Sequence, residues 1–88
     1  MKVLVTQVNL FAAAHPILLV DTETGEKKVM AQALAPQFIT PTIAHVANEH
    51  NIDNIHIFGN ETYVNKMAED LNVMAKTRYG KSFKIEVN

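Results

Sequence analysis

The stretch Asn54-Ile55-His56-Ile57-Phe58-Gly59-Asn60-Glu61-Thr62-Tyr63-Val64 decides the fold. Its first half is a short apolar run bounded by turn residues, which is typical of a strand buried within a sheet. Asn60 follows as a helix N-cap, because its side chain can accept a hydrogen bond from the first helical turn. The stretch therefore predicts a strand that leads directly into a helix, the repeating unit of α/β domains.

The helix predicted at the end of this stretch is amphipathic. Its apolar positions recur at helical spacing and form one stripe: Val64, Met67, Ala68, Leu71, Met74 and Ala75. Glu61 lies in the first turn, and Lys76 and Arg78 lie in the last turn, an arrangement that complements the helix dipole. We therefore expect the helix to continue to Gly80 and a final strand to follow at residues 83–87.

Three strands are predicted in the first part of the chain. Residues 3–10 mix β-branched and polar side chains at a spacing near two, which indicates a strand. Residues 17–20 and 28–34 form two more, joined by a turn in which Asp21 bonds the local backbone and Gly25 takes a positive φ. The first part of the chain therefore predicts a strand followed by a β-hairpin.

A first helix is predicted between the hairpin and the stretch quoted above. Thr40 is suited to the N-cap, and Pro41 to the first helical position, where a missing N–H costs nothing. Ile43 and Val46 then follow at helical spacing, and Asn51 is a suitable left-handed C-cap. The predicted order is thus β-β-β-α-β-α-β, without a linker, and residues 1–88 are expected to form a single α/β domain.

This order resembles the core of the ribonuclease H-like fold. In that family the fourth strand and the start of the next helix commonly read as an apolar strand, Thr-Asp-Ser, one residue and Tyr-Val, and residues 55–64 are similar to this pattern. Gly59-Asn60-Glu61 stands where Thr-Asp-Ser is usual. The resemblance implies a mixed five-stranded sheet in the order 3-2-1-4-5, with the two helices mainly on one face.

The chemistry of that family requires clustered carboxylates, since two divalent cations must be held about 4 Å apart. The first strand offers Thr6, Gln7 and Asn9 where the family has a central Asp, and the fourth strand ends in Asn60, which carries no charge. If the resemblance holds, the chain is a family member without the nuclease site. No catalytic residue and no cofactor are therefore expected.

One acidic motif leaves an enzymatic alternative open. Asp21-Thr22-Glu23-Thr24-Gly25 after an apolar strand resembles the first motif of DEDD-type 3'-5' exonucleases, in which the Asp and the Glu bind the same metal pair. That resemblance implies a metal-dependent nuclease using Asp21 and Glu23. The chain after Gly25 is too short for the remaining acidic residues of such a domain, so we favour a simple hairpin turn.

One basic cluster leaves a nucleic-acid alternative open. Lys76, Arg78, Lys81 and Lys84 follow one another around the end of the second helix and are candidates for phosphate contacts. No aromatic stacking platform accompanies them, and the formal net charge of the chain is −1. Dipole complementation and solubility are the favoured interpretation of these charges.

The predicted topology leaves one face of the sheet open. Both strand-helix-strand crossovers step in the same direction, and right-handed connections then place both helices on the same side. Residues 17–20 are apolar throughout, so the open face is expected to be apolar, with Ile17, Leu19, His56 and Phe58 as candidate interface residues. We therefore expect a homodimer or a protein partner at this face.

The composition of the chain excludes cysteine-based sites and predicts a cellular location. The chain has no cysteine, which excludes disulfides and thiolate metal sites. Polar Thr6, Gln7 and Asn9 interrupt the N-terminal apolar run, so neither a signal peptide nor a membrane anchor is expected, and a cytoplasmic location is predicted. The favoured function is a small accessory protein that acts by self-association and partner binding.

Overall fold

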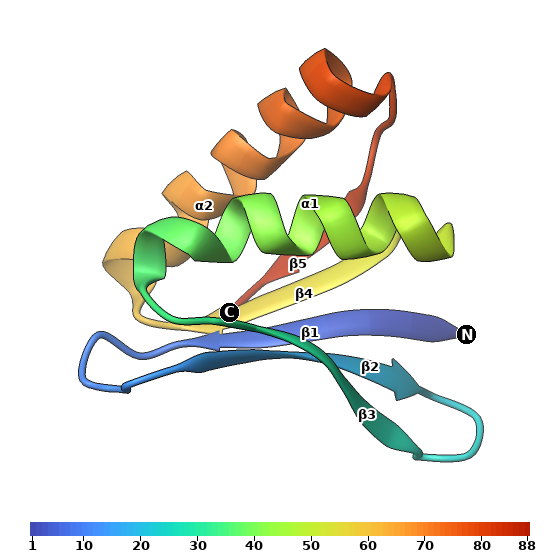
Figure 1. The fold of residues 1–88 in the computed structure, drawn as a ribbon, viewed down its shortest axis with the longest axis horizontal. Coiled ribbons are helices and arrows are strands. Elements are labelled where there is room, and N and C mark those ends of the chain that lie inside the picture. Colours follow the sequence, from blue (N-terminus) through green and yellow to red (C-terminus); the bar gives the residue numbers. More distant parts are fainter.

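The computed structural model describes residues 1–88 and contains one mixed sheet of five strands in the order β3-β2-β1-β4-β5 (Figure 1). The predicted sheet order is confirmed. Its strands are β1 (Lys2–Val8), β2 (His15–Asp21), β3 (Lys27–Ala33), β4 (Asn54–Gly59) and β5 (Lys84–Val87). The first three strands pair antiparallel, whereas β4 is parallel to β1 and β5 is parallel to β4. This arrangement is compatible with a ribonuclease H-like sheet.

Two helices connect the parallel strands. The first helix begins at a different residue from the one that the sequence predicts. A 3₁₀ turn at Pro36–Phe38 precedes α1 (Ile39–His50), so Phe38, and not Thr40, occupies the N-cap. Pro41 therefore lies inside the first turn, where backbone N–H groups have no partner within the helix. Apart from Pro36, no residue of this 3₁₀ turn indicates it in the sequence.

The second helix follows its prediction closely at both ends. α2 (Glu61–Met74) begins after Asn60, whose side-chain oxygen accepts a hydrogen bond of 3.0 Å from the N–H of Thr62. A π-helical turn at Ala75–Tyr79 extends it, and Gly80, with φ +63°, ends it. The chain then returns along β5 beside β4.

Both helices lie on the same face of the sheet (Figure 1). The connection from β3 through α1 to β4 and the connection from β4 through α2 to β5 both move across the sheet in the same direction. Since such crossovers are right-handed, the same direction requires the same side. The predicted placement of the helices is confirmed.

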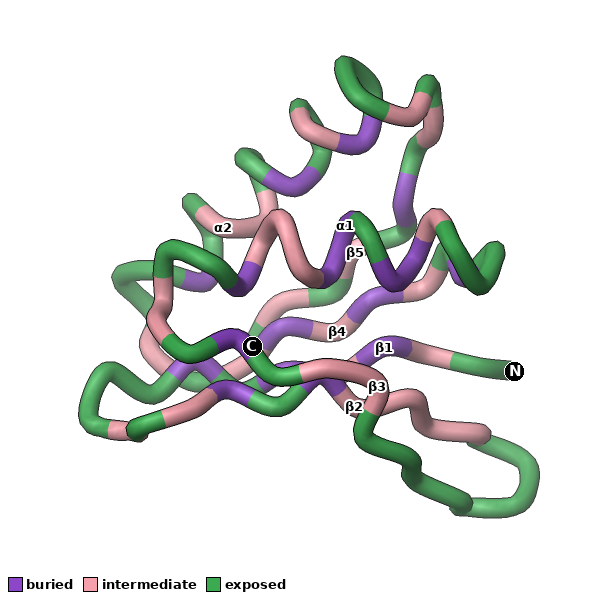
Figure 2. Tube along the Cα trace, viewed as in Figure 1, coloured by how far each residue is buried: buried purple, intermediate pink, exposed green.

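The core lies between these helices and the covered face of the sheet. Along β1 and β4, fully buried residues alternate with partly exposed ones, as Figure 2 shows. The sheet side of the core consists of Leu4, Val8, Ile17, Ala33, Ile55 and Ile57, and the helix side consists of Ile39, Ile43, Ala44, Val46, Ala47, Val64, Leu71 and Ala75. One face of the sheet thus supplies all of its contacts with the helices.

Two polar side chains are buried on the covered face. Thr6 and His15 are about as inaccessible as the apolar core, and neither the Thr6 hydroxyl nor the two ring nitrogens of His15 have a protein hydrogen-bond partner. A buried polar group without a partner lowers the stability of the folded state. The unpaired polar atoms of Thr6 and His15 therefore lower the free energy of unfolding.

We expect Thr6→Val to stabilise the protein by about 1 kcal/mol, because valine keeps the shape and removes the unpaired hydroxyl. Urea unfolding at neutral pH measures the change. The matched control is Thr62→Val on the exposed surface of α2, which we expect to change stability by less than about 0.5 kcal/mol. A loss of stability in Thr6→Val alone would contradict this interpretation.

Gly59 is required at the junction between β4 and α2. Its φ is +119°, and a Cβ atom there would overlap the carbonyl oxygen of Val8. We expect Gly59→Ala to destabilise the fold by at least about 2 kcal/mol. The control is Gly25→Ala at φ +76°, where nothing lies close to the added atom and about 1 kcal/mol is expected. Equal unfolding midpoints for the two variants would refute the role of the Val8 contact.

Candidate interaction face

The second face of the sheet has no helix over it. The strand register places Val5 beside Leu18 and Val3 beside Val20 on this face, with Phe58 of β4 next to Gln7. These apolar side chains are partly exposed. We call this surface, formed by Val3, Val5, Leu18, Val20, Val29, His56 and Phe58, the uncovered face.

Ile17 and Leu19, expected on this face, lie on the covered face instead. Ile17 is completely buried, and Leu19 pairs with Leu4 and packs against the core. Four consecutive apolar residues give no alternation from which to choose a face. Only the register with β1 shows that Leu18 and Val20 are the outward members of this run.

His56 and Phe58 lie on the uncovered face, where the sequence placed them. Their ring centroids are 5.7 Å apart in a tilted arrangement. The side-chain Nδ2 of Asn88 lies 3.0 Å from the Nε2 of His56, so the imidazole accepts a hydrogen bond in the tautomer that protonates Nδ1. A shallow hollow of about 350 Å³ on the same side includes Val3 and His56 in its lining.

Both edges of the sheet carry features that oppose strand addition. The β3 edge begins with Lys27 and Lys28 and contains a register shift opposite Ile17 and Leu18. The β5 edge has only four residues and begins with Lys84. Charged residues, bulges and short strands at an edge disfavour pairing with another chain. Neither edge is therefore suited to pairing with a strand of another chain.

The four basic residues proposed for phosphate contacts have different local surroundings. Lys76 lines a hollow with Ser82, whereas Arg78 lines another with Asp70. The Lys81 ammonium lies 3.4 Å from the side-chain oxygen of Asn51. Lys84 lies on the β5 edge and faces the same side as His56.

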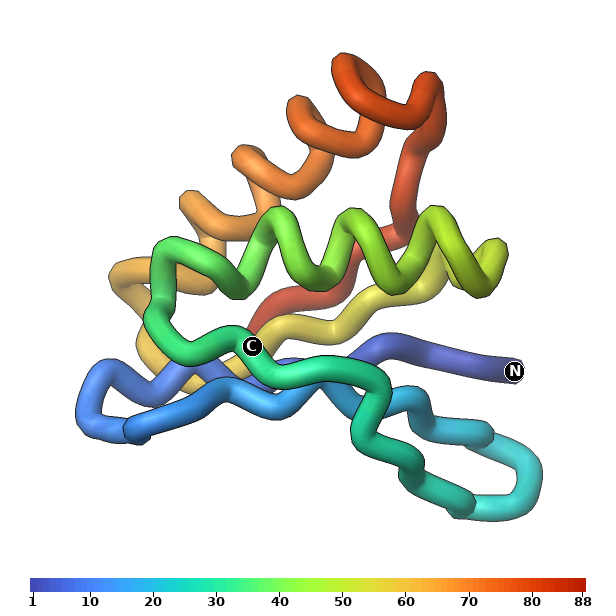
Figure 3. The backbone as a smooth tube through the Cα atoms, viewed as in Figure 1, coloured from blue at the N-terminus to red at the C-terminus, as the bar shows by residue number.

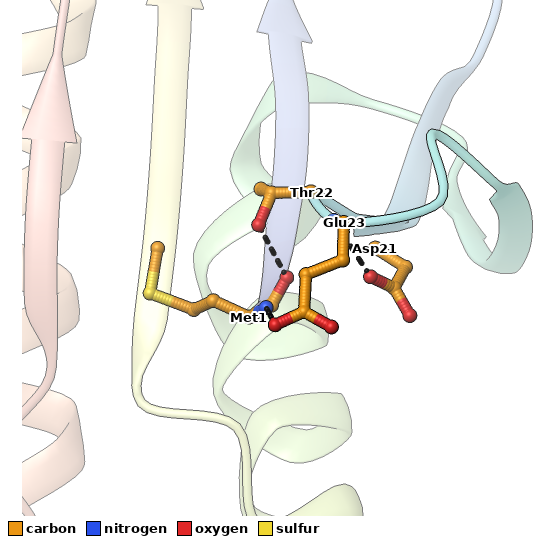
Figure 4. Close-up of polar contacts among 4 residues, drawn as sticks. All are labelled: Met1, Asp21, Thr22 and Glu23. Atoms are coloured by element: carbon orange, nitrogen blue, oxygen red, sulfur yellow. Dashed lines mark hydrogen bonds and ion pairs between the residues drawn. The ribbon is translucent and has the colours of Figure 1, made fainter.

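Asp21 is the last residue of β2, and Glu23 lies in the turn that follows it in the β2-β3 hairpin (Figure 4). The Asp21 carboxylate accepts a hydrogen bond of 2.9 Å from the N–H of Glu23, and its backbone oxygen accepts one of 2.8 Å from Gly25. The Glu23 carboxylate lies 3.8 Å from the amino group of Met1. No group of three or more His, Cys, Asp or Glu side chains is placed to hold a metal ion.

Uncharged residues occupy the positions at which the ribonuclease H-like pattern has carboxylates. Thr6 is buried under the helices, and the Asn9 side chain accepts a hydrogen bond of 3.0 Å from the N–H of Phe11. Asn60 caps α2. None of these groups bears a charge, so the arrangement offers no pair of metal-binding carboxylates.

The comparisons with known proteins yield one weak structural similarity. No protein-family model matches the chain, and no curated protein matches it. The chain is similar in structure to a crystal structure from Aquifex aeolicus that represents the Ppx/GppA protein family, with 13% sequence identity and a TM-score of 0.44. The match covers 100% of this chain but 35% of that chain.

None of the helices here has the length and apolar character needed to cross a membrane.

The turn geometry predicts an acid-dependent loss of stability. Hydrogen bonding from the N–H of Glu23 is the main cause that lowers the pKa of Asp21 below its ordinary value of 3.8. Because this pKa is depressed in the folded state, the ionised Asp21 carboxylate stabilises the fold above the unfolded pKa. This stabilisation is lost as the pH falls below about 4.

We expect Asp21→Asn to lose less unfolding free energy than the wild type between neutral pH and about pH 2.5, since the amide oxygen still accepts the hydrogen bond but does not titrate. Chemical unfolding at a series of pH values measures this difference. Glu69→Gln, on the exposed surface of α2, is the control and should follow the wild type. Parallel pH profiles for wild type and Asp21→Asn would rule out this contribution.

Proposed function

We propose that this chain is a non-catalytic interaction protein that acts by self-association through the uncovered face. The observation that carries the proposal is the apolar character of the three central strands on their solvent side: Val3, Val5, Leu18, Val20 and Phe58. A sheet with one solvated face usually presents polar residues there. An apolar solvated face is typical of a surface that another protein covers.

The size of the uncovered face suits a second copy of the chain. Strands of seven residues extend about 20 Å, and five strands spaced about 4.8 Å apart give a face of about 500 Å². Two copies would bury about 1,000 Å² in total, which is below the range of about 1,200–2,000 Å² for stable specific interfaces and in the range of weak, transient contacts. A weak, reversible dimer is therefore expected.

The distribution of side chains on the face also favours this mode. The apolar residues occupy the centre, while Lys84 and Glu86 lie on β5 at one side and Gln7 lies near the end of β1. An apolar centre with a polar rim is the usual organisation of protein interfaces. Two such sheets can pack face to face about 10 Å apart, as in β-sandwiches.

Leu18→Lys tests the proposal. Leu18 is central on the uncovered face and pairs with Val5, so a lysine there would place an unpaired charge in the dimer interface. We expect sedimentation equilibrium to show at least about 100-fold weaker association for this variant than for the wild type. Its circular dichroism should be unchanged, because the side chain is outside the core.

Asn72→Lys is the matched control, since it adds the same charge on the exposed surface of α2. This variant should associate like the wild type. A wild type that sediments as a monomer at about 100 μM, or a Leu18→Lys variant that associates as tightly as Asn72→Lys, would exclude self-association through the uncovered face.

A further inference from the structure

His56 is the only residue of the uncovered face that can carry a charge, because the other six residues of that face are apolar. It lies within β4, which runs between β1 and β5 (yellow, blue and red in Figure 3). Its register partner on β1 is Val5, and Val5 in turn pairs with Leu18 on β2. The imidazole is partly exposed in the single chain. A protein that covers the apolar centre of this face therefore also covers His56.

The contacts of His56 are those of a neutral ring. The side-chain Nδ2 of Asn88 donates to the His56 Nε2 over 3.0 Å, so this ring nitrogen carries no proton of its own. The ring of Phe58 lies on the other side of the contact, with 5.7 Å between the two ring centroids. A polar group that keeps its hydrogen bond is buried without a large penalty. The neutral imidazole is therefore compatible with a covered position.

The charged groups near His56 come from the sheet edge and the N-terminus. On β5, Glu86 is the register partner of His56, and Lys84 lies two residues before it. Met1 lines the same hollow as His56, and its amino group lies 3.8 Å from the Glu23 carboxylate. Strands β1 and β4 contribute no other charged side chain to this side, and both helices lie on the opposite face. In the single chain, a protonated His56 is thus met by Glu86 and by water.

Covering the face removes that water. The seven residues of the same face on a second copy include no carboxylate, so a protonated His56 gains no new partner there. If the contact also buries Glu86, both ions lose their hydration, and the attraction between two buried charges rarely exceeds this cost. Protonation of His56 therefore opposes the covered state.

We infer that protonation of His56 controls self-association through the uncovered face: the dimer forms while the imidazole is neutral and separates as the imidazole gains a proton. This inference rests on the proposed function, since it concerns the regulation of the same surface. Histidine is the side chain whose charge ordinarily changes between about pH 5 and 8. A modest acidification is therefore sufficient to shift the equilibrium towards the single chain.

Proton linkage gives the direction and the steepness of this effect. Each copy that leaves the dimer binds one proton at His56, so two protons are bound for each dimer that dissociates. The dissociation constant then rises as the pH falls, with a limiting slope of about 100-fold per pH unit. Carboxylates ordinarily titrate near pH 4. A comparison between about pH 7.5 and about pH 5.5 therefore changes mainly the charge of histidines.

The test is the dissociation constant of the full chain at these two pH values, measured by sedimentation equilibrium at constant ionic strength. We expect the constant of the wild type to be at least about 10-fold greater at the lower pH. His56→Gln and His56→Phe cannot gain this proton, so for each of them the two constants should agree within about two-fold. The control is His45→Gln, which removes a histidine on the exposed surface of α1, 3.8 Å from Glu49, and should keep the wild-type ratio.

The contrary outcomes separate this inference from the proposed function. A wild type whose constant is equal or lower at the acid pH would overturn the role of His56 and leave the uncovered face as an interface. Acid dissociation of both His56 variants to the wild-type extent would assign the effect to another group, such as the buried His15, and would also overturn it. A wild type that is monomeric at both pH values, like Leu18→Lys, would remove the proposed function and this inference together.

Discussion

The right-handedness of the two strand-helix-strand crossovers determines which face of the sheet the helices cover. Because α1 and α2 both carry the chain across the sheet in the same direction, both must pack on the same side. Their combined apolar surface covers one face of the five strands and builds the whole core there. The other face is left in contact with water, whatever residues it carries. The distribution of polar and apolar side chains on that face is therefore the feature that bears most directly on function.

The same topology also collects the loops at one end. The antiparallel strands β1 and β2 return at that end, and both helices begin there, so two segments without charge, residues 3–20 and 29–48, are brought together although they are separate in the sequence. The opposite end receives the charged hairpin turn. The uncovered face of the sheet is largely apolar, while the sheet edges carry lysines and a bulge. The lysines and the bulge disfavour open-ended strand pairing at the edges.

Much of the fold follows from local signals in the sequence. The β4 strand, the Asn60 cap, the Asn51 and Gly80 helix ends and the order of elements each depend on neighbouring residues, and the structure reproduces them. The candidate interface was less predictable. His56 could be assigned by its alternation with Ile55 and Ile57, but residues 17–20 are uniformly apolar, and the choice of Ile17 and Leu19 placed the wrong members of this run outside. Alternation carries that information only where polar and apolar residues differ.

The sequence by itself determined the type and order of the elements, because caps, turns and periodicity act over a few residues. The tertiary structure alone decided which apolar side chains are core and which face solvent. Pairing with β1 turns Leu18 outward and Ile17 inward, and pairing with β5 places Glu86 beside His56. These outcomes depend on register and topology, which join residues far apart in the chain and have no local signature.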